Sequence, residues 1–170
     1  MSSEYIRMKD FMGEKDLQVL ANQITDDLKM KRIKFVKKDG LFYAEFDNAP
    51  TVWVDTNREY EFQVCNLVRH LRMHWFWLRE GMKDKKMKEK DLPKILPKLL
   101  VMDIDSAVYT AYYLYYVEHL KSINHYRSAT SLQRLINFRV LPGLENKYTD
   151  TKEFLQASLK GPYLFTEFMN

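Results

Sequence analysis

The chain has 170 residues, of which 46% are hydrophobic and 14% aromatic. This length and composition suit a single folded domain over residues 1–170 and exclude an intrinsically disordered chain. The 27 basic and 23 acidic residues leave a formal net charge of +4, so nucleic-acid binding would have to rest on a local basic patch. Cys65 is the single cysteine, which excludes an internal disulfide and a cysteine-based zinc site.

The sequence shows no segment that would target or span a membrane. Its N-terminal residues lack an apolar signal core, and the longest apolar run, residues 108–117, is about half a membrane span. We therefore expect a soluble cytoplasmic protein with no membrane partner. The richness in methionine, lysine and tyrosine resembles the composition of some phage and viral proteins.

The first third of the chain predicts one helix and a small sheet. Residues 14–30 keep a helical stripe of apolar residues. The period then changes to alternation in residues 33–35 and 42–46, on either side of the turn Lys37-Lys38-Asp39-Gly40. An Asp-Gly turn between alternating runs predicts a β-hairpin, because glycine tolerates positive φ. Residues 51–55 predict a third strand, which completes an antiparallel sheet.

Residues 58–80 predict a long helix with two contrasting faces. One face is apolar and consists of Tyr60, Val64, Leu67, Val68, Leu71, Trp75 and Leu78. The opposite face carries Arg58, Arg69, Arg72 and Arg79, with Phe62, Cys65 and Phe76 among them. Such an arginine face suits phosphate binding, and it equally suits ion pairs with acids such as Glu61 and Glu118 between packed helices.

The rest of the chain predicts a linker followed by helices. Residues 83–91 are charged and linker-like. A short helix that Asp91 could cap runs through Met102, and Pro97, which lacks a backbone N–H, is expected to interrupt or kink it. Asp103 is predicted to cap a central helix that reaches Tyr126 and buries Tyr112 and Tyr115. Two more helices are predicted to begin near Ser128 and Asp150 and to end at Leu141-Pro142-Gly143 and Gly161-Pro162.

These elements predict an α+β fold that is predominantly helical. It consists of an N-terminal helix, a small antiparallel β-sheet made of a hairpin and a third strand, and then a bundle of four to five helices. The linker-like stretch lies inside this single domain.

Two spacings in the sequence match metal-binding patterns. His70 and His74 lie one helical turn apart, but Arg69 and Arg72 beside them oppose a cation, and no third ligand is predictable. Asp103 and Asp105 resemble a magnesium-binding pair, although capping of the predicted helix accounts for Asp103 more simply. We predict no metal and no cofactor.

Two further motifs have simpler explanations than chemistry. Lys37-Lys38-Asp39-Gly40 matches the K-x-D-G string of covalent nucleotidyltransferases, but that family needs additional strand motifs and a much larger domain. The same predicted hairpin resembles the wing of a winged helix, which requires more helices ahead of it than this chain has. We therefore predict no catalytic residues and no enzyme activity.

The leading functional prediction is a small non-catalytic protein that contacts nucleic acid, or a complex bound to it, through a basic and aromatic face. The alternative is a protein-interaction or assembly subunit whose arginine and aromatic surface is a protein interface. Arginines buried against acids would favour the alternative. The candidate binding residues are Arg69, Arg72, Phe76, Trp77, Arg79, Lys83, Lys85, Lys86 and Lys88.

Overall fold

The computed structural model describes residues 16–32, 34–38, 43–45, 51–55, 57, 60–80, 90, 92–118, 140–148 and 150–160. Within these ranges lie the α-helices α2 (Leu17–Asp27), α3 (Tyr60–Arg79), α4 (Leu92–Tyr112), α6 (Leu141–Lys147) and α7 (Thr151–Lys160). A short π-helix, η2 (Tyr113–Val117), continues α4. The strands are β1 (Lys34–Lys38), β2 (Tyr43–Glu45) and β3 (Thr51–Asp55).

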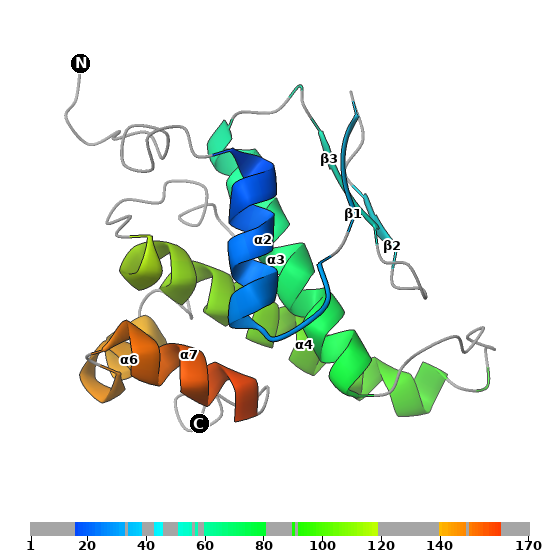
Figure 1. Ribbon diagram of the computed structural model, residues 1–170. Coiled ribbons are helices and arrows are strands. Elements are labelled where there is room, and N and C mark those ends of the chain that lie inside the picture. The colour runs from blue at the N-terminus through cyan, green and yellow to red at the C-terminus, as the bar shows by residue number, and fades with distance from the viewer. Residues whose placement is uncertain are drawn as a thin grey trace, which may run out of the picture.

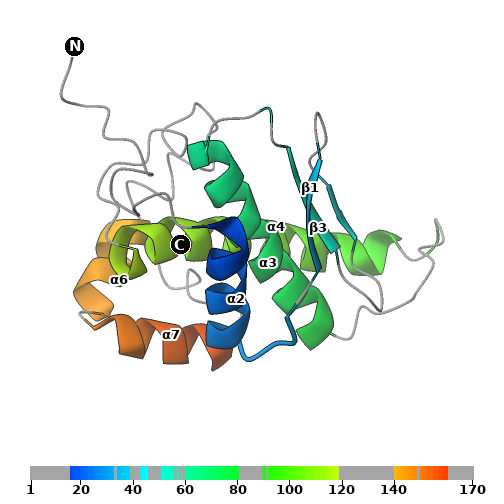
Figure 2. The same cartoon turned by 45° about the horizontal axis from the view of Figure 1, so that its top comes forward.

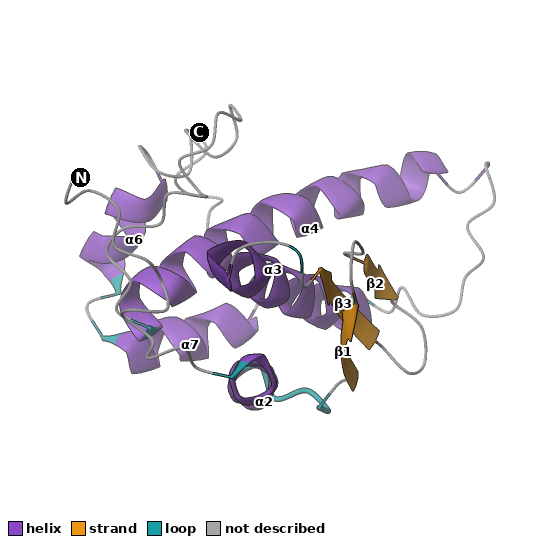
Figure 3. Ribbon diagram, turned by 90° about the horizontal axis from the view of Figure 1, so that it is seen from above, coloured by secondary structure: helices purple, strands orange, loops and turns teal. Residues whose placement is uncertain are grey.

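Helix α3 occupies the centre of the molecule. It contacts α2, α4 and β3, and Figures 1 and 3 show α2 and α4 on different sides of it. Figure 2 shows the sheet and the α6–α7 pair at opposite sides of α2 and α3. Val68 on the predicted apolar face is buried, but so are Cys65 and Phe76 among the arginines. Part of the arginine face therefore packs against other elements, as the ion-pair alternative predicted.

Helix α2 is shorter than the predicted range 14–30 because both of its ends are capped. The Asp16 carboxylate accepts hydrogen bonds from the N–H groups of Gln18 (2.8 Å) and Val19 (3.4 Å). At the other end Lys29 has a left-handed φ of 52°, and the Met30 N–H returns to the Thr25 carbonyl at 3.0 Å, as in a Schellman motif. The predicted stripe is confirmed as buried core: Leu17, Leu20, Ala21, Ile24 and Leu28.

The sheet is mixed, and its strand order is β1-β3-β2. Strand β3 pairs parallel to β1 and antiparallel to β2, so β1 and β2 are not neighbours and the predicted hairpin is wrong. The physical reason lies in strand polarity. The run Thr-Val-Trp-Val-Asp of β3 is the most apolar of the three and takes the central position, whereas the lysine-rich β1 takes an edge, where charge opposes further pairing.

The predicted α+β class with an antiparallel sheet is therefore contradicted. Helices make up most of the described residues, and Val52 of β3 is buried in the core. The fold is helical, with a small mixed sheet beside α3. Four α-helices follow the sheet in the described part of the chain.

The predicted interruption at Pro97 is also wrong. Helix α4 runs through Pro97 without interruption. Proline at this position removes one hydrogen bond to the Pro93 carbonyl, and both residues are exposed, so water can replace that bond. Leu141-Pro142-Gly143 forms the first turn of α6, where proline is tolerated because its missing N–H has no partner to lose. The helix that was predicted to end there lies outside the described residues.

Two predictions from the second half of the chain are confirmed. Tyr112 is fully buried, and its hydroxyl donates to the Tyr148 carbonyl at 2.5 Å. Asp150 caps α7 by accepting from the Lys152 N–H at 2.9 Å. Other predictions lie outside the described residues: the turn at 39–40, the capping box at 56–59 apart from Asn57, most of the linker 83–91, the side chain of Tyr115, and the helix near Ser128.

Candidate binding surface

The structure places Arg72 in the interior. Its side chain and that of Asp105 are both fully buried. The Arg72 Nε donates to Asp105 Oδ2 at 2.7 Å and the Nη2 donates to Oδ1 at 3.1 Å, which is the bidentate geometry that suits a guanidinium and a carboxylate. The guanidinium carbon lies 3.7 Å from the ring centroid of Trp75 and 4.6 Å from that of Tyr109. Arg72 therefore ties α3 to α4 and is not part of the exposed surface.

The two flanking arginines also bind neighbouring helices. Arg69 donates to Asp103 of α4, in a pair whose side chains are 33% and 45% exposed. Arg79 donates to the carbonyl oxygens of Leu159 and Lys160 at the end of α7. Carbonyls in the last turn of a helix carry the negative end of the helix dipole, so a cation there is favourable. The arginine face thus binds α3 to α4 and α7.

The remaining candidate binding residues do not form one described surface. Phe76 is buried and Trp77 is partly buried. The four lysines lie outside the described residues: Lys83, Lys85, Lys86 and Lys88. Their predicted role in binding stays a prediction, but Arg72 and Phe76 have no exposed surface to contribute to it.

The two aspartates that resembled a cap or a magnesium site have another role. Both lie within α4, and both receive arginines from α3. The sequence indicated that the arginines could pair with acids and suggested Glu61 and Glu118. The side chain of Glu61 lies outside the described residues, and Glu118 accepts from Gln23 at 2.6 Å. Spacing along the chain could not identify Asp103 and Asp105, because the pairing depends on how two separate helices cross.

His70 is held in its neutral form. Burial, followed by the nearby His74 and Arg69, lowers the pKa of His70 to about 3, because a charged imidazole there would be desolvated and repelled. Within the described residues, no group of three or more His, Cys, Asp or Glu side chains is placed to hold a metal ion. His70 and His74 therefore fit a structural role within α3.

A polar network joins α2 to the π-helix η2. Gln23 donates to the Tyr113 hydroxyl at 2.7 Å and to Glu118, and the Tyr113 hydroxyl donates to Asp27 at 3.0 Å. Burial raises the pKa of Asp27, the Tyr113 hydrogen bond lowers it, and the negative charges of Asp26 and Glu118 raise it further. Gln23 and Asp27 belong to α2, and Tyr113 belongs to η2. The network therefore holds α2 against η2, where α4 ends.

Tyr109 and Tyr113 provide a matched test of buried hydroxyl groups. Both are fully buried, but in the described part of the chain the Tyr109 hydroxyl has no hydrogen-bond partner. An unpaired buried hydroxyl costs about 1 to 3 kcal/mol. We therefore expect Tyr109→Phe to raise the free energy of unfolding by about 1 kcal/mol, and Tyr113→Phe to lower it by a similar amount. Urea denaturation measures both. Equal destabilisation by the two variants would contradict the bonding described here.

The first half of α4 carries an exposed surface that the sequence did not single out. Leu96 and Leu100 are 52% and 58% exposed, and Pro93 and Pro97 are exposed beside them. Figures 1 and 3 show these first turns extending away from α2, α6 and α7. The i, i+4 spacing of the two leucines was visible in the sequence, but a spacing alone does not separate a core stripe from an exposed one.

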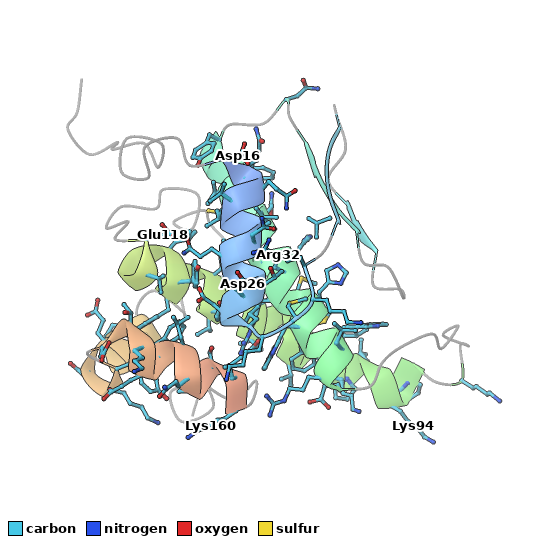
Figure 4. All side chains as sticks on the ribbon, viewed as in Figure 1. Asp16, Asp26, Arg32, Lys94, Glu118 and Lys160 are labelled. Atoms are coloured by element: carbon cyan, nitrogen blue, oxygen red, sulfur yellow. The ribbon has the colours of Figure 1, made fainter. Side chains whose placement is uncertain are left out.

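Lysines accompany this apolar surface. Lys90, Lys94 and Lys98 are exposed, and in Figure 4 the labelled Lys94 points away from the body of the molecule. Lys98 lies 3.8 Å from Glu80 at the end of α3, while its side chain stays 51% exposed. A separate ion pair, labelled in Figure 4, joins Asp26 of α2 to Arg32, which follows the helix. The first half of α4 therefore combines exposed leucines with exposed positive charge.

No protein-family model, curated protein or solved structure matches this chain. None of the helices in the described ranges is both long and apolar enough to cross a membrane. The function is therefore inferred from the surfaces and contacts of the chain itself.

Proposed function

We propose that this chain is a non-catalytic protein-interaction or assembly subunit that acts in the cytoplasm. The observation that carries the proposal is the burial of Arg72 against Asp105. A phosphate-binding arginine must present its guanidinium to solvent, whereas the donors of Arg72 point into the protein interior. Arg69 and Arg79 likewise bond to the neighbouring helices α4 and α7.

The exposed residues of α4 support the same proposal. Single exposed apolar residues are ordinary on a protein surface, but Leu96 and Leu100 lie one helical turn apart, with exposed prolines between and before them. Contiguous apolar surface bordered by polar residues is typical of sites that bind other proteins. Nucleic-acid binding would instead depend on the lysines of residues 83–98 acting without the arginines.

Affinity purification of the tagged chain from its native host, with and without nuclease, tests the proposal. We expect a protein partner to be recovered at equal yield in both samples. In parallel, fluorescence anisotropy at low salt should detect no binding to single- or double-stranded DNA or RNA.

The opposite pattern would support the nucleic-acid prediction. A partner lost after nuclease, or nucleic-acid binding that weakens steeply with salt, would contradict the proposal. In that case the charge reversal of Lys85 and Lys86 to glutamate should weaken binding uniformly across nucleic-acid sequences, because phosphate contacts carry no sequence information.

A further inference from the structure

The first two turns of α4 present an apolar strip to solvent. Pro93, Leu96, Pro97 and Leu100 are all exposed, and at 100° per residue they fall within an arc of about 100°. Later in the same helix Met102 is buried, where α4 packs against α3. The amino-terminal turns of α4 therefore extend beyond the core, and the exposed face of these turns is apolar. We call these four residues the α4 strip.

A row of positive charge borders the α4 strip on one side. Lys94 and Lys98 of α4 are exposed, and their i, i+4 spacing places them on one side of the helix, next to Pro97. Lys90, which precedes α4, is also exposed. Residues 92–102 contain no acidic residue, although Asp91 directly precedes them and Glu80 of the preceding segment lies 3.8 Å from Lys98. The amino end of a helix adds partial positive charge from its unpaired N–H groups. An occupant of the strip therefore meets apolar surface in the middle and positive charge along one edge.

A second copy of the chain is a poor occupant of this strip. Antiparallel pairing of two copies would bring the two lysine rows to the same side, and parallel pairing would bring two positive helix ends together. Four side chains per copy also fall well short of the roughly 800 Å² per partner that stable interfaces bury. A partner that brings negative charge avoids this repulsion and gains attraction instead.

We propose that the α4 strip docks an acidic amphipathic segment of another protein, with apolar side chains against Leu96 and Leu100 and carboxylates along the lysine row. This inference rests on the proposed interaction function and names the chemistry of the partner. A helix laid along a helix face in this way anchors through residues one turn apart. The small apolar area and the exposed charges predict weak binding, with a dissociation constant of about 10 to 100 µM.

Peptide binding to the full chain tests the proposal. The probe is a fluorescein-labelled synthetic amphipathic helix with leucines along one face and glutamates on both flanks, and the control probe carries lysines in place of the glutamates. We expect the acidic probe to bind and the basic probe not to bind. Paired replacement of Leu96 and Leu100 by serine should weaken binding about tenfold or more, and Lys90→Gln with Lys94→Gln should weaken it and reduce its salt dependence.

The control variant is Val19→Ser, which replaces an apolar residue of similar exposure, 55%, on α2. It should leave binding unchanged. All variants alter exposed side chains, so unchanged melting temperatures will confirm that each still folds. Equal binding of the acidic probe to wild type and to the serine pair would overturn the proposal. The proposal would also be overturned if the acidic probe failed to bind while the serine pair abolished another interaction of the wild type. That interaction could be binding to anionic lipid vesicles, binding to nucleic acid, or self-association.

Failure of this inference can be distinguished from failure of the proposed function. If a nuclease-resistant protein partner is recovered equally by wild type and by the serine pair, the function stands and the docking site is wrong. If no such partner is recovered with either protein, the proposed function itself fails.

Discussion

Replacing Asp105 with alanine should lower the free energy of unfolding by about 3 to 5 kcal/mol, because it leaves the guanidinium of Arg72 buried without its counter-ion. The pair is fully buried and bidentate, so truncating the carboxylate removes both of these hydrogen bonds from a desolvated cation. The matched control is Asp103→Ala on the same helix. Its partner Arg69 is partly exposed, and we expect a loss of at most about 1 kcal/mol. Urea denaturation measures both losses.

A double replacement separates the ion pair from simple packing. Removing both charges, as Arg72→Met with Asp105→Leu, should recover much of the lost stability, because apolar residues of similar volume need no desolvated charges. Equal losses for Asp103→Ala and Asp105→Ala would contradict the burial of this pair. A double variant no more stable than Asp105→Ala would show that volume, and not charge, sets the cost.

Phe154→Ala should also cost about 3 to 5 kcal/mol, because it removes a fully buried aromatic ring from the contact between α7 and α4. The ring centroid of Phe154 lies 3.9 Å from that of Tyr112, 5.8 Å from that of Tyr109 and 6.1 Å from that of Tyr148. This residue therefore anchors α7 to the tyrosine-rich end of α4. Aromatic pairs of this kind contribute beyond the area that they bury.

Chemical denaturation and hydrogen exchange together test the role of Phe154. The stability of Phe154→Ala should fall, and the amides of α7 should lose protection more than those of α2. Gln156→Ala, at an exposed position of the same helix, should change stability by no more than about 0.5 kcal/mol. Unchanged protection of α7 in the alanine variant would show that other contacts hold this helix.

Local features of the fold could be predicted from the sequence. The apolar stripe of α2 follows from spacing alone, and the cap at Asp150 follows from one residue type at a helix start. Strand order could not be predicted, because the Asp-Gly turn describes only its own neighbourhood, whereas the central place of β3 depends on pairing between distant residues. The interruption at Pro97 was predicted wrongly for a related reason. The free-energy cost of its missing hydrogen bond depends on whether the surroundings are exposed to water.

The candidate site could likewise be predicted from the sequence only in part. Two faces on the helix 58–80 could be recognised from the sequence, and pairing of its arginines with acids was one of two readings. The acids themselves, Asp103 and Asp105, became identifiable only when the crossing of α3 and α4 was known. The α4 strip was not recognised because exposed and buried leucines look alike in a sequence. Packing between helices, and not local pattern, decides which face reaches solvent.

The exchange of the Arg72 Nε proton with water, measured by NMR, tests most directly that the arginine face is internal. Arg32 provides the reference, because its side chain is 63% exposed although it pairs with Asp26. The Arg72 Nε–H donates to Asp105 in the interior, so we predict a persistent signal that exchanges far more slowly than that of Arg32 and loses its protection in Asp105→Ala. An Arg72 signal that exchanges as fast as that of Arg32 would place the guanidinium in solvent, where it could bind phosphate, and would contradict the account.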